Sequence, residues 1–169
     1  FTPAETQQIS ISTPGLFDKS KAFSIDFTSM GDRAYSFPLP VGKATLSDKE
    51  DRLEITSKKG DAVKAMFDGC VRLARKMDRH GNVIVIRHDN GLETVYENNA
   101  QNLVQSGQTV KAGQTIAIIG NDGEQGLCPF FIMVNGSRVN PTTIVNARNH
   151  RLYRQVLAFE KRGANIRIT

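Results

Sequence analysis

A short β-branched run followed by Asn-Gly constrains this chain more than any other feature of its sequence. Val83–Ile86 is too short for a helix and is typical of a buried strand. His88–Gly91 ends the run with Asn-Gly, the strongest short-range signal for a hairpin. In Leu92–Glu97 the alternation then places Glu93 and Glu97 on one side of a returning strand. The sequence therefore predicts antiparallel β-structure in this region.

A weak internal repeat favours the same class of fold. Gly60–Ala65 reads Gly-Asp-Ala-Val-Lys-Ala and recurs as Gly107–Ala112, Gly-Gln-Thr-Val-Lys-Ala. In each copy we expect a glycine turn, then a valine that points inward and a lysine that points outward. Two copies of such a unit are typical of a sandwich or barrel assembled from duplicated β-motifs. Chance similarity over these few positions is the alternative.

Length and composition set broad limits on the chain. With 169 residues, 39% of them hydrophobic, it suits one domain with additions at its ends. No apolar run approaches the roughly 20 residues of a membrane span. Because the chain begins at Phe1, we expect that a targeting segment has been removed. Cys70 and Cys128 are too few for a disulfide scaffold, so we expect small core residues and leave a bridge as the alternative.

The chain divides into three parts by its sequence pattern. Residues 1–34 are predicted to form a β extension with strands at Ile9–Ser12 and Phe23–Phe27, after polar first residues that fray. Residues 35–147 are predicted to form the main β domain. Residues 148–169 are predicted to form a basic helical tail.

The tail differs from the rest in charge and periodicity. It carries six basic residues against Glu160 alone, so it holds the entire net charge of +5. Its apolar side chains have the spacing of an amphipathic helix, which Asn149 would cap and Gly163 would end. These side chains are Leu152, Tyr153, Val156 and Leu157. A solvated helix face is the simpler interpretation, and a surface for anionic partners is the alternative.

Several short motifs in Gly60–Pro141 together carry a family resemblance. In order they are Gly-x-x-Val-x-Ala, Asp-Gly, Gly-Asn, a β-run, His-x-Asn-Gly, Thr-x-Tyr, Val-x-x-Gly-x-x-Val-x-x-Gly, and Val-Asn-Gly with a following proline. The segment from Ser36 to Pro141 resembles the LytM, or lysostaphin-type, zinc endopeptidases, which cut peptide crosslinks in bacterial cell wall. The resemblance implies a mainly β fold, a duplicated-hybrid-motif sandwich or barrel.

The resemblance also implies where a metal site would lie. A catalytic zinc needs about three protein ligands and an open position for water. The family's first ligand pair falls on Glu50 and Glu54, its late His-x-His on Leu127 and Pro129, and a further histidine on Asn98. Only Glu54 keeps a ligand-like side chain. We therefore expect no metal cofactor and no catalytic residues at this site.

The remaining histidines do not restore the site. His80 and His88 belong to turn segments that the family also has outside its metal site, and we expect turn and surface positions for them. His150 lies in the tail. No nucleophile and base occur at a convincing spacing for another hydrolytic mechanism.

We expect the family's substrate groove to survive as a recognition surface. Its residues would be Glu50, Glu54, Tyr96, Asn98, Leu127, Pro129 and Phe131. Along a strand the last three share one face, which would give the groove an apolar floor, partly filled by Tyr96 or the N-terminal extension. The alternative is that these three are ordinary core residues and no groove remains.

The sequence thus predicts an inactive LytM-like domain that acts outside the cytoplasm as a cell-wall-associated binding or regulatory module. Peptidoglycan or another envelope protein is the implied partner, and nucleic acid is not. Two alternatives stay open. The first is an active endopeptidase with a non-standard site. The second is a biotinyl or lipoyl carrier domain, in which Lys76-Met77 would correspond to the turn that carries the modified lysine.

Overall fold

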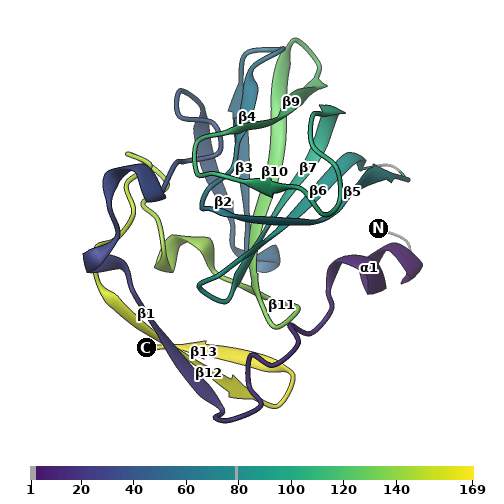
Figure 1. Ribbon diagram of the computed structural model, residues 1–169. Helices are drawn as coiled ribbons and strands as arrows, with labels where there is room; N and C mark the ends of the chain where they lie inside the picture. Colours follow the sequence, from purple (N-terminus) through teal and green to yellow (C-terminus); the bar gives the residue numbers. More distant parts are fainter. Residues whose placement is uncertain (1–2, 79) are drawn as a thin grey trace.

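Antiparallel strands dominate the computed structural model, which describes residues 3–78 and 80–169 (Figure 1). The strands are β1 (Ala22–Asp26), β2 (Lys43–Ser47), β3 (Arg52–Ser57), β4 (Ala62–Lys64), β5 (Gly69–Met77), β6 (Gly81–His88), β7 (Leu92–Asn102), β8 (Thr109–Val110), β9 (Thr115–Asp122), β10 (Gln125–Val134), β11 (Ser137–Val139), β12 (Val156–Arg162) and β13 (Asn165–Ile168). The helix α1 spans Pro3–Ile9, and short 3-10 helices span Phe27–Ser29, Asp32–Ala34, Asp48–Glu50 and Pro141–Thr143. The predicted mainly β fold is confirmed.

The large sheet has the strand order β2-β3-β10-β9-β7-β6-β5-β8, with β4 on β9 and β11 on β10. β10 pairs with β3 on one side, and on the other it pairs first with β9 and then with β7. This change of partner along one strand curls the sheet around a main core, in which Leu53, Phe130 and Ile132 are fully buried.

The predicted hairpin is confirmed. β6 and β7 pair across the turn at Asn90-Gly91, where the φ of Gly91 is 99°. The two repeat copies also adopt the same structure. Each follows a glycine with positive φ and forms a short strand, β4 or β8, whose valine is buried. These valines are Val63 and Val110.

A buried chain of hydrogen bonds ties the β6–β7 hairpin to the segment before β5. The Met66 N–H donates to the Tyr96 hydroxyl, which lies 2.7 Å from Thr94 Oγ1. Thr94 Oγ1 lies 2.7 Å from His88 Nε2, and His88 Nδ1 lies 2.8 Å from the Asp68 carbonyl oxygen. A carbonyl can only accept, so Nδ1 carries the proton and Nε2 accepts from Thr94. Burial lowers the pKa of His88 to about 4, which keeps the imidazole neutral. The expected surface position of His88 is wrong.

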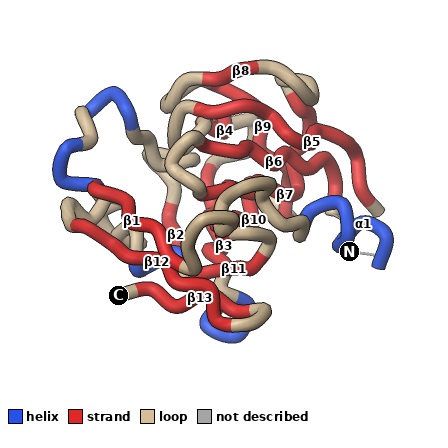
Figure 2. The backbone as a smooth tube through the Cα atoms, turned by 60° about the horizontal axis from the view of Figure 1, so that its bottom comes forward, coloured by secondary structure: helices blue, strands red, loops and turns tan. Residues whose placement is uncertain are grey.

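The predicted C-terminal helix is also wrong. Val156–Arg162 forms β12, which turns at Gly163 into β13 and pairs on its other edge with β1 (Figures 1 and 2). Leu157 and Phe159 alternate inward from β12, as a strand requires. The partner strand β1 lies more than a hundred residues earlier, so no local periodicity could indicate the pairing. The expected edge strand at Ile166 and Ile168 is confirmed as β13.

The N-terminal extension is helical where a first strand was expected. The helix α1 includes the residues that were predicted to fray and ends at Ile9, so the predicted strand at Ile9–Ser12 does not form. Phe1 lies outside the described residues. Alternation over so few residues could not distinguish a strand from the last turn of a helix, and Ile9 is buried because it packs against the large sheet. The predicted strand at Phe23–Phe27 is confirmed as β1, with Phe27 in the following 3-10 helix.

The three predicted parts do not remain separate in space. Strands from residues 1–34 and 148–169 form one small sheet, β1-β12-β13, below the large sheet (Figure 1). The boundaries of the three parts stay a prediction. Neither cysteine is bridged; Cys128 is buried as expected, but Cys70 is exposed. No helix within residues 3–78 and 80–169 is long and apolar enough to cross a membrane.

We predict that Tyr96→Phe destabilises the protein by about 1–3 kcal/mol, because it leaves the buried Met66 N–H without its acceptor. Urea denaturation measures the difference. Tyr153→Phe is the matched control, because Tyr153 is 39% exposed, and it should change stability by less than about 0.5 kcal/mol. Equal stabilities for the two variants would contradict a structural role for the hydrogen-bond chain.

Candidate functional site

Alternate residues of β10 divide between the core and the opposite face of the large sheet. Cys128 and Phe130 belong to the main core. Leu127, Pro129 and Phe131 point to the other side, where Leu127 and Pro129 are half-buried and Phe131 is buried. We call this second side the groove face; it comprises the outward residues of β3, β7 and β10. The predicted shared face of these three residues is therefore present.

The strand register brings other predicted site residues to the groove face. Pro129 lies directly opposite Glu54 of β3. Asn98 has a left-handed backbone, with φ 61°, and its Nδ2 donates to the Leu127 carbonyl oxygen at 2.8 Å. Gly120 permits this approach, since a Cβ there would lie 1.8 Å from the Asn98 carbonyl oxygen. Glu54, Asn98, Leu127 and Pro129 thus form one cluster.

An arginine links the two predicted glutamates. Arg52 Nη1 lies 2.6 Å from Glu50 Oε2, and Arg52 Nη2 lies 2.5 Å from Glu54 Oε1. Glu50 itself is exposed in the 3-10 helix before β3. Because the guanidinium already pairs with both carboxylates, Glu50 and Glu54 are not a free acidic pair.

A second arginine covers the apolar part of the cluster. The Arg138 guanidinium carbon lies 3.8 Å from the centre of the Phe131 ring, a cation–π contact. Arg138 Nη1 also donates to the Glu50 carbonyl oxygen at 3.1 Å. β11 supplies this arginine, because Arg138 pairs with Met133 of β10.

Glu97 is a buried carboxyl group on the same face, only 2% exposed. Its Oε2 lies 3.2 Å from His80 Nδ1. Burial raises the pKa of Glu97 to about 7, and Glu54 adds to the rise, whereas Arg138 and Arg52 oppose it. Burial also lowers the pKa of His80. His80 therefore lies in a turn, as expected, but beside a buried acid.

Tyr96 does not line the groove face, which corrects the prediction. It pairs with Phe130 in the β7–β10 register, is fully buried, and points into the main core. The strand alternation already placed it opposite Glu97. Tyr96 therefore cannot fill the groove.

The N-terminal extension does cover part of this side of the sheet, as predicted. Ile9 is 1% exposed and packs in a second apolar cluster with Phe131. The other buried members are Met77, Val83, Val85, Val95 and Met133. Arg72 holds the end of α1 by donating to the carbonyl oxygens of Gln8 and Ile9, while it also pairs with the buried Glu93. Leu127 and Pro129 lie outside this cluster.

The residues present do not fit a zinc ion. Leu127 and Pro129, where the resemblance implies a His-x-His pair, have no side-chain donor atoms. The remaining carboxylate, Glu54, is paired with a guanidinium that would repel a metal cation. Within residues 3–78 and 80–169, no group of three or more His, Cys, Asp or Glu side chains is placed to hold a metal.

Sequence reasoning missed the charged residues of the cluster. Arg52 and Arg138 correspond to no motif, and their roles depend on strand register. Glu97 could have been found, because it follows Tyr96 and alternation places it on the groove face.

The fold defines a class of protein, a mainly β domain built from antiparallel sheets. The family model for peptidase family M23 matches residues 49–141, and the chain belongs to this family.

Curated relatives are known from several bacteria. The murein hydrolase activator EnvC of Escherichia coli is 38% identical over 89 residues, which cover 52% of this chain and 21% of EnvC. The murein hydrolase activator NlpD of Salmonella typhimurium is 38% identical over 91 residues, which cover 53% of this chain and 24% of NlpD. The chain thus matches about a fifth to a quarter of the length of these relatives.

Solved structures support the fold. Lysostaphin from Staphylococcus simulans matches with a TM-score of 0.58 at 21% identity, over 68% of this chain and 53% of lysostaphin. A peptidase M23 from Pseudomonas aeruginosa matches with a TM-score of 0.61 at 19% identity, over 82% of this chain and 56% of that chain.

We predict that the purified protein, after equilibration with zinc and dialysis, retains far less than one zinc per chain by elemental mass spectrometry. The reason is the missing donors at Leu127 and Pro129 and the guanidinium beside Glu54. About one zinc per chain, lost in Glu54→Ala and kept in the control Glu124→Ala, would contradict this.

We predict that Glu97 makes the protein less stable as the pH rises from about 4.5 to about 7. The pKa of this carboxyl is 4.5 ordinarily and about 7 in the fold, so the folded state holds its proton more tightly and loses that advantage as pH rises. Glu97→Gln should remove about 2–3 kcal/mol of this decline in urea denaturation at several pH values. Because His80 lies 3.2 Å from Glu97, the difference between the two proteins reports the Glu97–His80 pair.

Glu124→Gln, at an exposed turn, is the matched control and should keep the wild-type pH profile. The same decline in Glu97→Gln as in the wild type would show that Glu97 ionises normally.

Proposed function

We propose that this domain is a catalytically inactive family M23 domain that acts outside the cytoplasm as a cell-wall-associated regulatory module. One observation carries the proposal: Pro129, where the family resemblance implies a metal-binding histidine, lies opposite Glu54, and Glu54 is paired with Arg52. Two matched relatives are murein hydrolase activators, which supports regulation as the role that replaces hydrolysis.

The exposed part of the groove face suits a peptide-like ligand. Leu127 and Pro129 offer apolar contact beside the polar side chain of Asn98, all three half-buried. Thr56, which pairs with Leu127, also lines a hollow of about 640 Å³ together with Lys43 and Lys58. A bound segment could extend from Leu127 and Pro129 toward these lysines. Peptide parts of peptidoglycan and segments of an envelope protein both have this chemistry.

The two alternatives have less support. For a hydrolase with another site, the His80–Glu97 pair would have to supply the base, and the sequence offers no nucleophile at a convincing spacing from it. For a carrier domain, Lys76 would have to lie in a turn. It lies within β5, paired with Asn82 of β6.

Dye release from labelled peptidoglycan tests the catalytic part of the proposal. The protein alone should release no more dye than buffer, and it should increase release by an added murein hydrolase. Release by the protein alone at a rate above buffer would contradict inactivity, and an unchanged hydrolase rate would contradict regulation of that enzyme.

Co-sedimentation with isolated peptidoglycan and with the added hydrolase tests the groove face. Leu127→Glu should weaken binding about tenfold, because it places a charge on the apolar contact surface that Leu127 and Pro129 form. Val156→Glu is the matched control, since Val156 is 58% exposed on the small sheet. Equal binding by the two variants would contradict recognition through the groove face and would indicate that another surface binds the ligand.

A further inference from the structure

A rigid basic loop connects the two sheets. The isolated bridge between Val145 and Leu152 closes the loop, and the Asn146 N–H donates to the Arg151 carbonyl oxygen at 2.8 Å. Asn146 Oδ1 also accepts from the Arg148 N–H at 2.8 Å. These bonds replace the helix that the sequence predicted, and they fix the direction in which the loop's basic side chains leave the backbone.

His150 has an unusual backbone conformation and several contacts that hold its ring in this loop. Its backbone is left-handed, with φ 66°, a conformation that non-glycine residues rarely adopt. Its ring stacks on Phe37 with centroids 4.0 Å apart and an interplanar angle of 6°. The Tyr35 hydroxyl donates to the His150 carbonyl oxygen at 2.6 Å, and His150 Nδ1 lies 3.2 Å from the Pro40 carbonyl oxygen. The ring orientation is therefore fixed, with Nε2 left for another partner. Such a costly conformation is typical of binding sites.

The loop borders a hollow with excess positive charge. A volume of about 390 Å³ is lined by Asp32, Tyr35, His150, Arg151, Leu152 and Arg154. Arg154 is already engaged, because it donates to the Met30 carbonyl oxygen and lies 3.6 Å from Asp32 Oδ1. Arg151 is exposed and, among the described residues, its guanidinium has no bonded partner. The one acidic lining residue is thus paired, and one arginine remains free.

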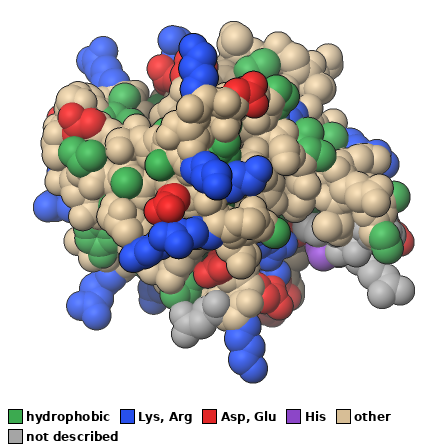
Figure 3. Space-filling model, turned by 90° about the horizontal axis from the view of Figure 1, so that it is seen from below, with side chains coloured by type: hydrophobic (Ala, Val, Ile, Leu, Met, Phe, Trp, Pro, Cys, Tyr) green, Lys and Arg blue, Asp and Glu red, His purple; other side chains and the backbone are tan. Residues whose placement is uncertain are grey.

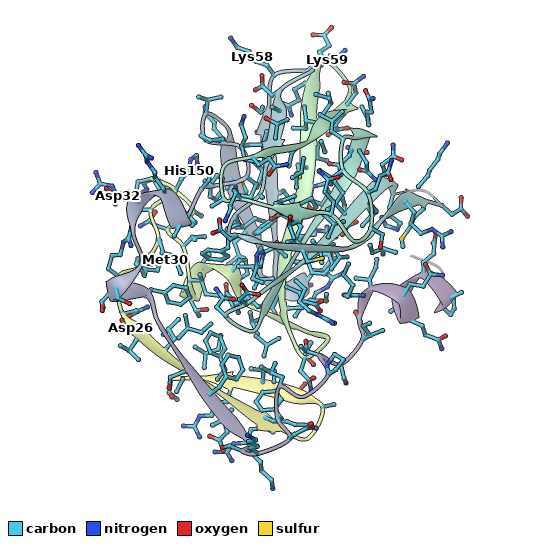
Figure 4. The ribbon with its side chains drawn as sticks, in the orientation of Figure 1. Asp26, Met30, Asp32, Lys58, Lys59 and His150 are labelled. Atoms are coloured by element: carbon cyan, nitrogen blue, oxygen red, sulfur yellow. The ribbon has the colours of Figure 1, made fainter. Side chains whose placement is uncertain are left out.

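We propose that this hollow binds a carboxylate or phosphate group, with Arg151 as its donor and the fixed ring of His150 as one of its walls. A guanidinium presents a planar fork of N–H groups that matches either anion. The Arg154–Asp32 pair shapes the opposite wall without consuming the charge of Arg151. In Figure 4, Asp32 and His150 lie on the side of the molecule away from α1, and Lys58 and Lys59 extend from its far tip. No residue that lines this hollow belongs to the cluster of Glu54, Asn98, Leu127 and Pro129, so the site is distinct from that cluster and its test is independent of the proposed function.

Titration of the full chain with sodium phosphate and with sodium acetate, at constant ionic strength against sodium chloride, tests the site. The side-chain NMR signals of Arg151 and His150 should shift and saturate. Arg151→Gln should weaken binding about tenfold, the loss expected for one charge-assisted hydrogen-bond pair. Arg151→Lys keeps the charge but not the planar fork of N–H groups, so its affinity for the anion should lie between that of the wild type and that of Arg151→Gln. Arg162→Gln is the matched control, because Arg162 is an exposed arginine paired with Glu160 at 3.0 Å.

The outcomes separate the possibilities. Saturation with both anions supports a general anion site, and saturation with phosphate alone supports a phosphate site. Shifts that stay linear with concentration, or an equal loss in Arg151→Gln and Arg162→Gln, would overturn the proposal and leave only non-specific attraction to a basic surface.

Discussion

The register of β10 is the constraint on which the rest of the structure depends. This strand pairs with β3 along one edge and with β9 and β7 along the other, so it fixes the position of every strand that contributes to the site. A shift by one residue would turn Cys128 and Phe130 outward and bury Pro129 in the core. The fully buried Phe130 makes that shift costly, since exposing one large apolar side chain loses about 2–3 kcal/mol. The main core thereby determines which residues can form the groove face.

The sequence predicted the elements whose interacting residues lie close together along the chain, and it did not predict those whose partners lie far away along the chain. The hairpin at Asn90-Gly91 and the glycine turn at Gly60 are local, and both form as expected. β12 was misassigned because its hydrogen-bonding partner, β1, comes from the other end of the chain. The same reason explains the site: Glu54, Leu127 and Pro129 could be placed by family spacing, whereas Arg52 depends on contacts that only the folded chain creates.

The ion pairs of Arg52 and a bound metal would stabilise this region in different ways. A half-exposed arginine–glutamate pair contributes about 0–1 kcal/mol, so Arg52 does not hold the fold together. Its effect is on chemistry, because Arg52 and the neighbouring Arg138 together balance the charges of Glu50 and Glu54 without the open coordination position that activates water. Placing Glu97 nearby, buried and with a raised pKa, further lowers the negative charge available to a cation. The groove face has therefore become a nearly neutral, partly apolar surface.

Charge is distributed differently on the rest of the molecule. The sequence placed the basic excess in one tail, yet seen from below, lysine and arginine side chains occur at several separate places with acidic side chains between them (Figure 3). On β12 and β13, Glu160 lies opposite Arg167 and pairs with Arg162, so one of the basic charges in that part of the tail is offset. Within the described part of the chain, Arg148 and Arg151 of the loop are paired with no acidic side chain. A net charge spread over a chain therefore says little about binding. The unpaired charges say more, because an anion that binds them does not have to displace an existing partner.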